Sequence, residues 1–154
     1  MKLTEILSAE RVVSGTTVTS KKKALEELSN LLASGAADLG SHEVFSSLTG
    51  REKLGSTGLG HGVAIPHGRV AGIERSVGAF MRLKHPVEYD SHDGNPVDLI
   101  FGLLVPQSAN DQHLKHLAAV AEMFSDDDFC AKLRAGGDNA ALYALLSGYV
   151  PAGR

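Results

Sequence analysis

The stretch Thr57–Arg69 reads TGLGHGVAIPHGR and is the most informative part of the sequence. Its first three glycines stand at alternate positions, which allows backbone at positive φ or backbone close to a ligand. Pro66 fixes its own φ and favours an extended Ile65, so the apolar run before it is predicted to be a short strand that ends near His67. Gly68 then leaves room beside the imidazole.

A histidine at the end of such a strand can expose one ring nitrogen while the backbone holds the other. Reversible phosphorylation of an imidazole needs this arrangement, because one nitrogen must be a neutral nucleophile and the ring must be fixed in tautomer and direction. The residues alone leave a purely structural histidine open. A phosphate-binding nucleotide loop is a weaker interpretation, since no Lys-Ser or Lys-Thr follows the glycines and Pro66 opposes an immediate helix.

Two strands are predicted on the C-terminal side of this motif. Apolar residues stand at every second position from Val77 to Leu83, so residues 76–83 are predicted to form a strand. Residues 97–105 are almost wholly apolar, as expected of a strand covered on both faces. The polar segment 88–96 separates the two and contains a Gly-Asn-Pro turn signal.

Helices are predicted on both sides of the motif. The first begins near Ser20, a good N-cap, carries leucines at helical spacing and stops at Ser34-Gly35. Further helices are predicted over residues 41–53, from 110 or 111 to 124, over 127–135 and over 139–146. Because helices and strands interleave, the sequence predicts an α/β protein with a largely covered sheet.

Composition and charge argue against several function classes. A chain of 154 residues that is 43% hydrophobic can build one core, and we predict a single domain over residues 1–154. A net charge of -3 and only 5% aromatic residues argue against nucleic-acid binding. One cysteine permits no internal disulfide, the N-terminus lacks a secretory signal, and no apolar run approaches the ~20 residues of a membrane helix. We therefore expect a cytoplasmic protein without membrane insertion.

Three further polar residues stand out, each with a plain alternative. Arg51 lies near the end of a predicted helix and could be a surface arginine paired with a carboxylate. His113 falls in the first turn of another helix, where it could cap local polar groups; a helix N-terminus also disfavours imidazolium and attracts anions. His61 would share a face with His67 if residues 61–67 were regularly extended, which makes it a peripheral candidate, but Pro66 disturbs that regularity.

A metal site is not predicted. His113 and His116 have the helical spacing of metal ligands, but no Glu completes a His-Glu-x-x-His pattern and no cysteine pair exists. A metal-dependent hydrolase built on the seven histidines is therefore the weakest alternative.

The motif resembles the active-site motif of the fructose- and mannitol-type enzyme IIA domains of the bacterial phosphotransferase system, and most of all the nitrogen-regulatory IIA proteins. The resemblance rests on the core Gly-x-Gly-x-Gly-Val-Ala-Ile-Pro-His and covers nearly the whole chain. It also includes Leu3–Leu7, the helix Lys-Lys-Ala-Leu-Glu-Glu-Leu, Arg51-Glu52, Val105-Pro106 and His113–Leu117. It implies a mixed, mostly parallel five-stranded sheet with helices on both faces.

The resemblance also implies roles for the residues. His67 matches the phosphoryl acceptor, while Arg51 and His113 match the family's active-site arginine and second active-site histidine. The glycines assigned to the phosphoryl loop are Gly60, Gly62 and Gly68. No cofactor is implied.

The implied partners are proteins. An HPr-type phosphocarrier would supply the phosphoryl group, and the output would be either regulation related to nitrogen or potassium, or transfer to a IIB domain for sugar uptake. Since the donor is a folded protein, His67 is expected on a shallow apolar surface. We predict that this surface includes Leu59, Val70, Ile73, Val105 and Pro106.

Overall fold

The structure is a computed structural model that describes residues 3–149, except for the side chain of Gln112. The predicted domain 1–154 also includes residues 1–2 and 150–154, which lie outside the described residues. Two 3-10 helices, η1 (Leu3–Glu5) and η2 (Ala9–Arg11), precede the first strand. The elements that follow are β1 (Val12–Thr16), α1 (Lys21–Ala33), α2 (Ser41–Glu52), β2 (Gly58–Gly60), β3 (Val63–Ala64), β4 (His67–Val70), β5 (Val77–Val87), β6 (Val97–Pro106), α3 (Asp111–Phe124), α4 (Asp127–Ala135) and α5 (Asn139–Ser147).

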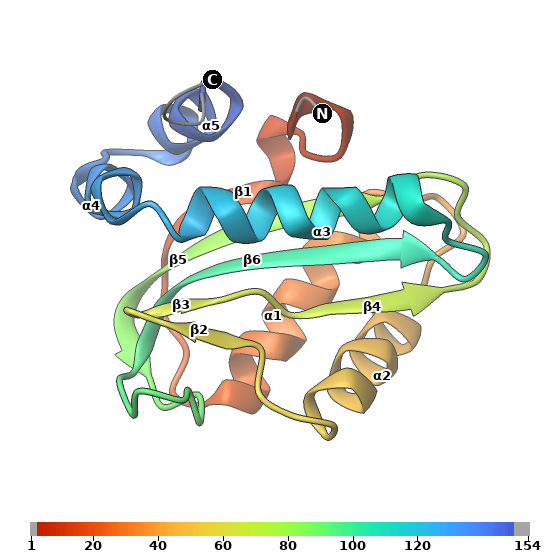
Figure 1. The fold of residues 1–154 in the computed structure, drawn as a ribbon, viewed down its shortest axis with the longest axis horizontal. Coiled ribbons are helices and arrows are strands. Elements are labelled where there is room, and N and C mark those ends of the chain that lie inside the picture. Colours follow the sequence, from red (N-terminus) through yellow and green to blue (C-terminus); the bar gives the residue numbers. More distant parts are fainter. Residues whose placement is uncertain (1–2, 150–154) are drawn as a thin grey trace.

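One mixed sheet forms the centre of the molecule (Figure 1). Its strand order is β1-β5-β6-β3-β2, and β4 also pairs with β6. Val63 of β3 lies opposite Leu99 and His67 of β4 lies opposite Leu103, so the two short strands follow each other along β6 in one register. The pairs β1–β5, β3–β6 and β4–β6 are parallel, whereas β2–β3 and β5–β6 are antiparallel. The predicted mixed, mostly parallel sheet is confirmed, but it contains six strands instead of five, because Ile65-Pro66 divides the segment beside β6 into β3 and β4.

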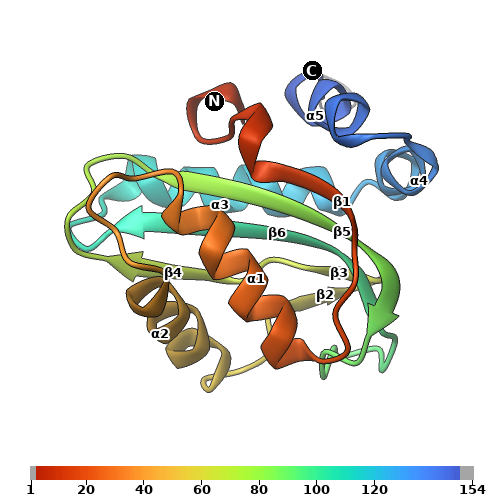
Figure 2. The same ribbon diagram turned by 180° about the vertical axis from the view of Figure 1, so that it is seen from behind.

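Helices cover both faces of this sheet (Figures 1 and 2). The helices α3, α4 and α5 lie on one face and enclose a core with Phe101 and Leu103 of β6. On the other face, α1 and α2 enclose a core with Ile100 and Leu104. Alternate residues of β6 thus enter opposite cores, which explains why the strand is almost wholly apolar.

Most helix boundaries agree with the sequence signals. The Ser20 hydroxyl accepts a hydrogen bond from the Lys23 N–H at 3.1 Å and begins α1, as predicted. Asp126 and Asp138 cap α4 and α5 in the same way. None of the helices between residues 3 and 149 is both long and apolar enough to cross a membrane.

The strands differ more from the prediction. The strand expected over residues 76–83 continues to Val87, because an irregularity after Arg82 lets Val87 pair with Val97. The strand β1 was not predicted, since its sequence Val-Val-Ser-Gly-Thr is short and does not alternate in polarity.

Candidate active site

His67 is the first residue of β4, at the edge of the sheet. Its Nδ1 lies 2.9 Å from the carbonyl oxygen of Ile65. A carbonyl oxygen can only accept a hydrogen bond, so Nδ1 carries the proton of the neutral ring and Nε2 keeps its lone pair. The stiff Ile65-Pro66 segment between β3 and β4 therefore fixes both the tautomer and the direction of the half-buried imidazole.

Gly68 allows α2 to approach β4 closely. A Cβ atom at this position would lie 2.2 Å from the hydroxyl oxygen of Ser47. That hydroxyl donates a hydrogen bond to the carbonyl oxygen of Arg69 at 2.8 Å and fastens α2 to the edge of β4. Because Arg51 follows Ser47 by one helical turn, this contact also places the arginine next to the strand that carries His67.

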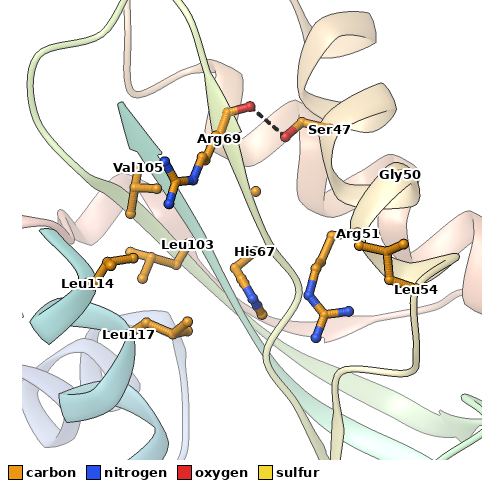
Figure 3. A pocket seen from close by; sticks show the side chains of 11 residues that line it. Ser47, Gly50, Arg51, Leu54, His67, Arg69, Leu103, Val105, Leu114 and Leu117 are labelled. Atoms are coloured by element: carbon orange, nitrogen blue, oxygen red, sulfur yellow. Dashed lines mark hydrogen bonds between the residues drawn. The ribbon is translucent and has the colours of Figure 1, made fainter. Parts of the chain in front are cut away.

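Arg51 lies in the last turn of α2. Its Nη1 donates a hydrogen bond to the carbonyl oxygen of Gly55 at 2.9 Å, which leaves its other N–H groups available. Figure 3 shows the guanidinium of Arg51 beside the imidazole of His67. Its hydrogen bond thus goes to a backbone carbonyl, and none of the ion pairs among the described residues includes Arg51.

Glu52 anchors the segment that follows Arg51, and sequence reasoning gave it no role. Its carboxylate accepts hydrogen bonds from the Thr57 N–H at 3.1 and 3.2 Å, from the Thr57 hydroxyl and from the Tyr89 hydroxyl at 3.0 Å. Lys21 pairs with it at 3.0 Å. Burial, followed by the neighbouring Glu52 charge, raises the pKa of Tyr89 well above its ordinary range, so the phenol stays a donor. The network joins segments that are distant in sequence, so it can be recognised only in the folded structure.

His67 and Arg51 line one depression of about 450 Å³ (Figure 3). The lining residues are Ser47, Gly50, Arg51, Leu54, His67, Gly68, Arg69, Leu103, Val105, Leu114 and Leu117. Leu54 is 83% exposed and Leu114 is 43% exposed, so apolar side chains face solvent at its margin. None of the described lining residues is acidic, and two are arginines. The site is thus an apolar surface with positive charge beside an imidazole nitrogen that keeps its lone pair.

The composition of this apolar surface differs from the prediction. Val105 lines the depression, but the lining does not include Leu59, Val70, Ile73 or Pro106. Its apolar side chains come from α3, from β6 and from Leu54, which follows the end of α2. The predicted residues Leu59 and Val70 instead lie in β2 and β4, and Ile73 follows β4.

His113 is not brought into the depression of His67. It lines a second depression together with His116, Arg75 and Ser76. Its Nδ1 accepts a hydrogen bond from the Asn110 N–H at 3.3 Å, and its own N–H donates to the Asn110 side chain at 3.3 Å. This is the local capping arrangement considered from the sequence, so a direct contact of His113 with a phosphoryl group stays a prediction.

Gly60, His61 and Gly62 form the tight turn between β2 and β3, at the end of β3 away from β4 (Figure 1). All three have positive φ, at 92°, 56° and 81°. Asp93 accepts a hydrogen bond from the His61 N–H at 2.8 Å, and Arg134 donates to the His61 carbonyl at 2.7 Å. The structure therefore assigns these residues to a hairpin turn outside the His67 depression, and of the three predicted loop glycines only Gly68 lines that depression.

Between residues 3 and 149, no group of three or more His, Cys, Asp or Glu side chains is arranged to hold a metal ion. The second depression, with His113 and His116, contains a single carboxylate, that of Glu5. Nothing in the described part of the chain thus favours the metal-dependent hydrolase.

The chain is similar to known proteins over most of its length. The family model described as "Phosphoenolpyruvate-dependent sugar phosphotransferase system, EIIA 2" matches residues 5–149. Two relatives are named nitrogen regulatory protein. The one from Bradyrhizobium diazoefficiens is 45% identical to this chain and covers 96% of this chain and 95% of its own length. The one from Pseudomonas aeruginosa is 40% identical and covers 95% of this chain and 95% of its own length. The crystal structure of the nitrogen regulatory protein IIA-Ntr from Neisseria meningitidis superposes with a TM-score of 0.87 at 44% identity, covering 94% of this chain and 98% of that one. On sequence and fold together, this chain belongs to the EIIA 2 family of the phosphotransferase system and is IIA-Ntr-like within it.

Proposed function

We propose that this chain is a phosphohistidine carrier that accepts a phosphoryl group on Nε2 of His67 from an HPr-type protein. The observation that carries the proposal is the hydrogen bond between Nδ1 of His67 and the Ile65 carbonyl, which leaves Nε2 as the nucleophile. The Arg51 guanidinium beside the ring supports it, because its planar donors suit the oxygens of a phosphoryl group.

The proposed transfer is an in-line displacement between two imidazoles. The donor phosphohistidine carries a proton on its other ring nitrogen, so when its phosphorus–nitrogen bond breaks and the bond to Nε2 of His67 forms, the donor ring leaves as a neutral imidazole. The Nδ1 proton of His67 stays on its ring, where the Ile65 carbonyl stabilises the positive charge that the ring acquires. Arg51 neutralises charge on the transferring oxygens, so the step depends on positioning rather than on a strong base.

We further infer that the output is regulatory. Similarity over almost the full length to proteins named nitrogen regulatory protein supports this role. Phosphorylation would place about -1.5 to -2 charges, the value for phosphorylated hydroxyl residues, between the exposed apolar side chains of Leu54 and Leu114. Burial of that surface by a partner would then be opposed, so regulatory partners that cover His67 should bind the unphosphorylated form more tightly. Transfer to a IIB domain through the same surface is the alternative output.

The direct test is incubation with an HPr-type protein, enzyme I and phosphoenolpyruvate, followed by intact mass measurement. We expect one phosphoryl group that is labile in acid and stable in base. His67→Gln should abolish it, whereas the matched variant His61→Gln, outside the depression, should be phosphorylated like the wild type. Full labelling of His67→Gln would refute the assignment.

A further inference from the structure

Arg69 lies on the same side of β4 as His67. The two residues are separated by one position in a regular strand, so their side chains project from the same face, about 6.6 Å apart at the backbone. In the sheet they lie opposite Leu103 and Val105 of β6, which both belong to the core on the α3 side. Figure 3 shows the Arg69 guanidinium beside Val105, with His67 between it and Arg51.

Within residues 3–149, the positive charge of the Arg69 guanidinium has no hydrogen-bonded or ion-paired partner. Only the carbonyl oxygen of Arg69 is bonded to Ser47. The described residues that line its depression include a second arginine and no carboxylate. Two permanently charged guanidiniums at one apolar depression repel each other, and an anion held between them would remove that repulsion.

We propose that Arg69 is a second phosphoryl-binding arginine, which contacts the phosphoryl group of phosphorylated His67 from the side opposite Arg51. This inference rests on the proposed function. An extended arginine side chain is about as long as the separation between alternate residues of a strand, so the guanidinium can reach the phosphoryl oxygens above His67. A phosphoryl group offers three oxygens, which two guanidiniums can share.

The expected consequence is stabilisation of the doubly charged phosphoryl group. A guanidinium in contact lowers the pKa of the second phosphoryl ionisation, because it favours the dianion over the monoanion. It also shifts phosphoryl exchange with a donor towards this protein. Arg69 does not contact the proton on Nδ1, so its loss should leave the nucleophile in place.

The test uses the full chain, phosphorylated with phosphoramidate so that no partner protein is needed, and follows the phosphohistidine signal by ³¹P NMR during a pH titration. We expect Arg69→Gln to raise the titration midpoint by about 0.5–1 pH unit. Arg69→Lys, which keeps the charge, should raise the midpoint by less than Arg69→Gln does. Lys84→Gln, which removes one charge from an exposed residue of β5, is the matched control and should leave the midpoint unchanged.

The outcomes separate this inference from the proposed function. If the wild-type chain is not phosphorylated on His67, the proposed function fails and the role of Arg69 fails with it. If the wild type is phosphorylated and Arg69→Gln titrates with the wild-type midpoint, the role of Arg69 alone is overturned. An equal shift in Arg69→Gln and Lys84→Gln would also overturn it, because the effect would then be one of net charge.

Discussion

Gly68→Ala tests the contact that places Arg51 beside His67. The new Cβ would lie 2.2 Å from the Ser47 hydroxyl oxygen and 3.2 Å from the Ser47 carbonyl carbon. Ser47 must rotate away and lose its hydrogen bond to Arg69, a cost of about 1 kcal/mol. Displacement of the α2 backbone from β4 adds about 1–3 kcal/mol of overpacking. We therefore expect the free energy of unfolding to fall by about 2–4 kcal/mol.

Urea unfolding followed by circular dichroism measures this loss. Gly137→Ala is the matched control, since a Cβ there meets no atom within 4 Å, and it should leave stability nearly unchanged. In a Ser47→Ala background, Gly68→Ala should cost less than in the wild type, because the nearest clashing atom is gone. A loss below about 0.5 kcal/mol for Gly68→Ala, within the range of ordinary surface substitutions, would refute the close packing of α2 on β4.

Three further predictions concern groups at and near the site. Arg51→Lys keeps the charge but loses the planar donors, so the single-turnover rate of phosphotransfer should fall by about 10²-fold. An unchanged rate would mean that Arg51 is an ordinary surface residue. Glu52→Ala removes a buried partner of Lys21, and urea unfolding should show a loss of about 3–5 kcal/mol, whereas a loss under about 1 kcal/mol would contradict the network. Burial, with a smaller effect of the His113 charge, lowers the pKa of His116 below its ordinary 6.5, so the unfolded chain binds this proton more readily. Neutral His116 should therefore contribute to the free energy of unfolding above pH 6.5, and this contribution should be lost as the pH falls below 6.5. If the difference in unfolding free energy between wild type and His116→Gln does not change with pH, this prediction is wrong.

The sequence predicted the elements whose signals are local. Ser20 indicated the start of α1 as an N-cap residue, and the apolar run of residues 97–105 indicated a strand buried on both faces. The order of the strands was expected only from the family resemblance, because pairing between distant segments leaves no periodic signal. The short strands β2 and β4 are formed by pairing with β3 and β6, respectively, so their own sequences carry no strand signal.

The candidate site was predictable to a similar degree. The stiff Ile65-Pro66 segment indicated how His67 would be held, and the structure shows the expected backbone partner. The roles of Gly60 and Gly62 depend on Asp93 and Arg134, which approach from distant parts of the chain. For the same reason, the alternating glycines of the motif do not distinguish a hairpin turn from a ligand-binding loop.

Arg69 was inside the motif but received no role, since only the arrangement of β4, α2 and α3 shows that it shares a depression with His67. Glu52, next to Arg51, was quoted only as part of the family resemblance. Its partners Lys21, Thr57 and Tyr89 come from three separate segments, so the network appears only in the folded chain.

In the proposed function, Nε2 of His67 is the atom that carries the phosphoryl group. Long-range ¹H–¹⁵N correlation spectra of the histidine rings, recorded before and after phosphorylation, test it most directly. The structure predicts that Nε2 of His67 changes to a phosphorylated nitrogen while Nδ1 keeps its proton and its hydrogen bond to the Ile65 carbonyl. Phosphorylation of Nδ1, or of any other histidine in place of His67, would contradict it.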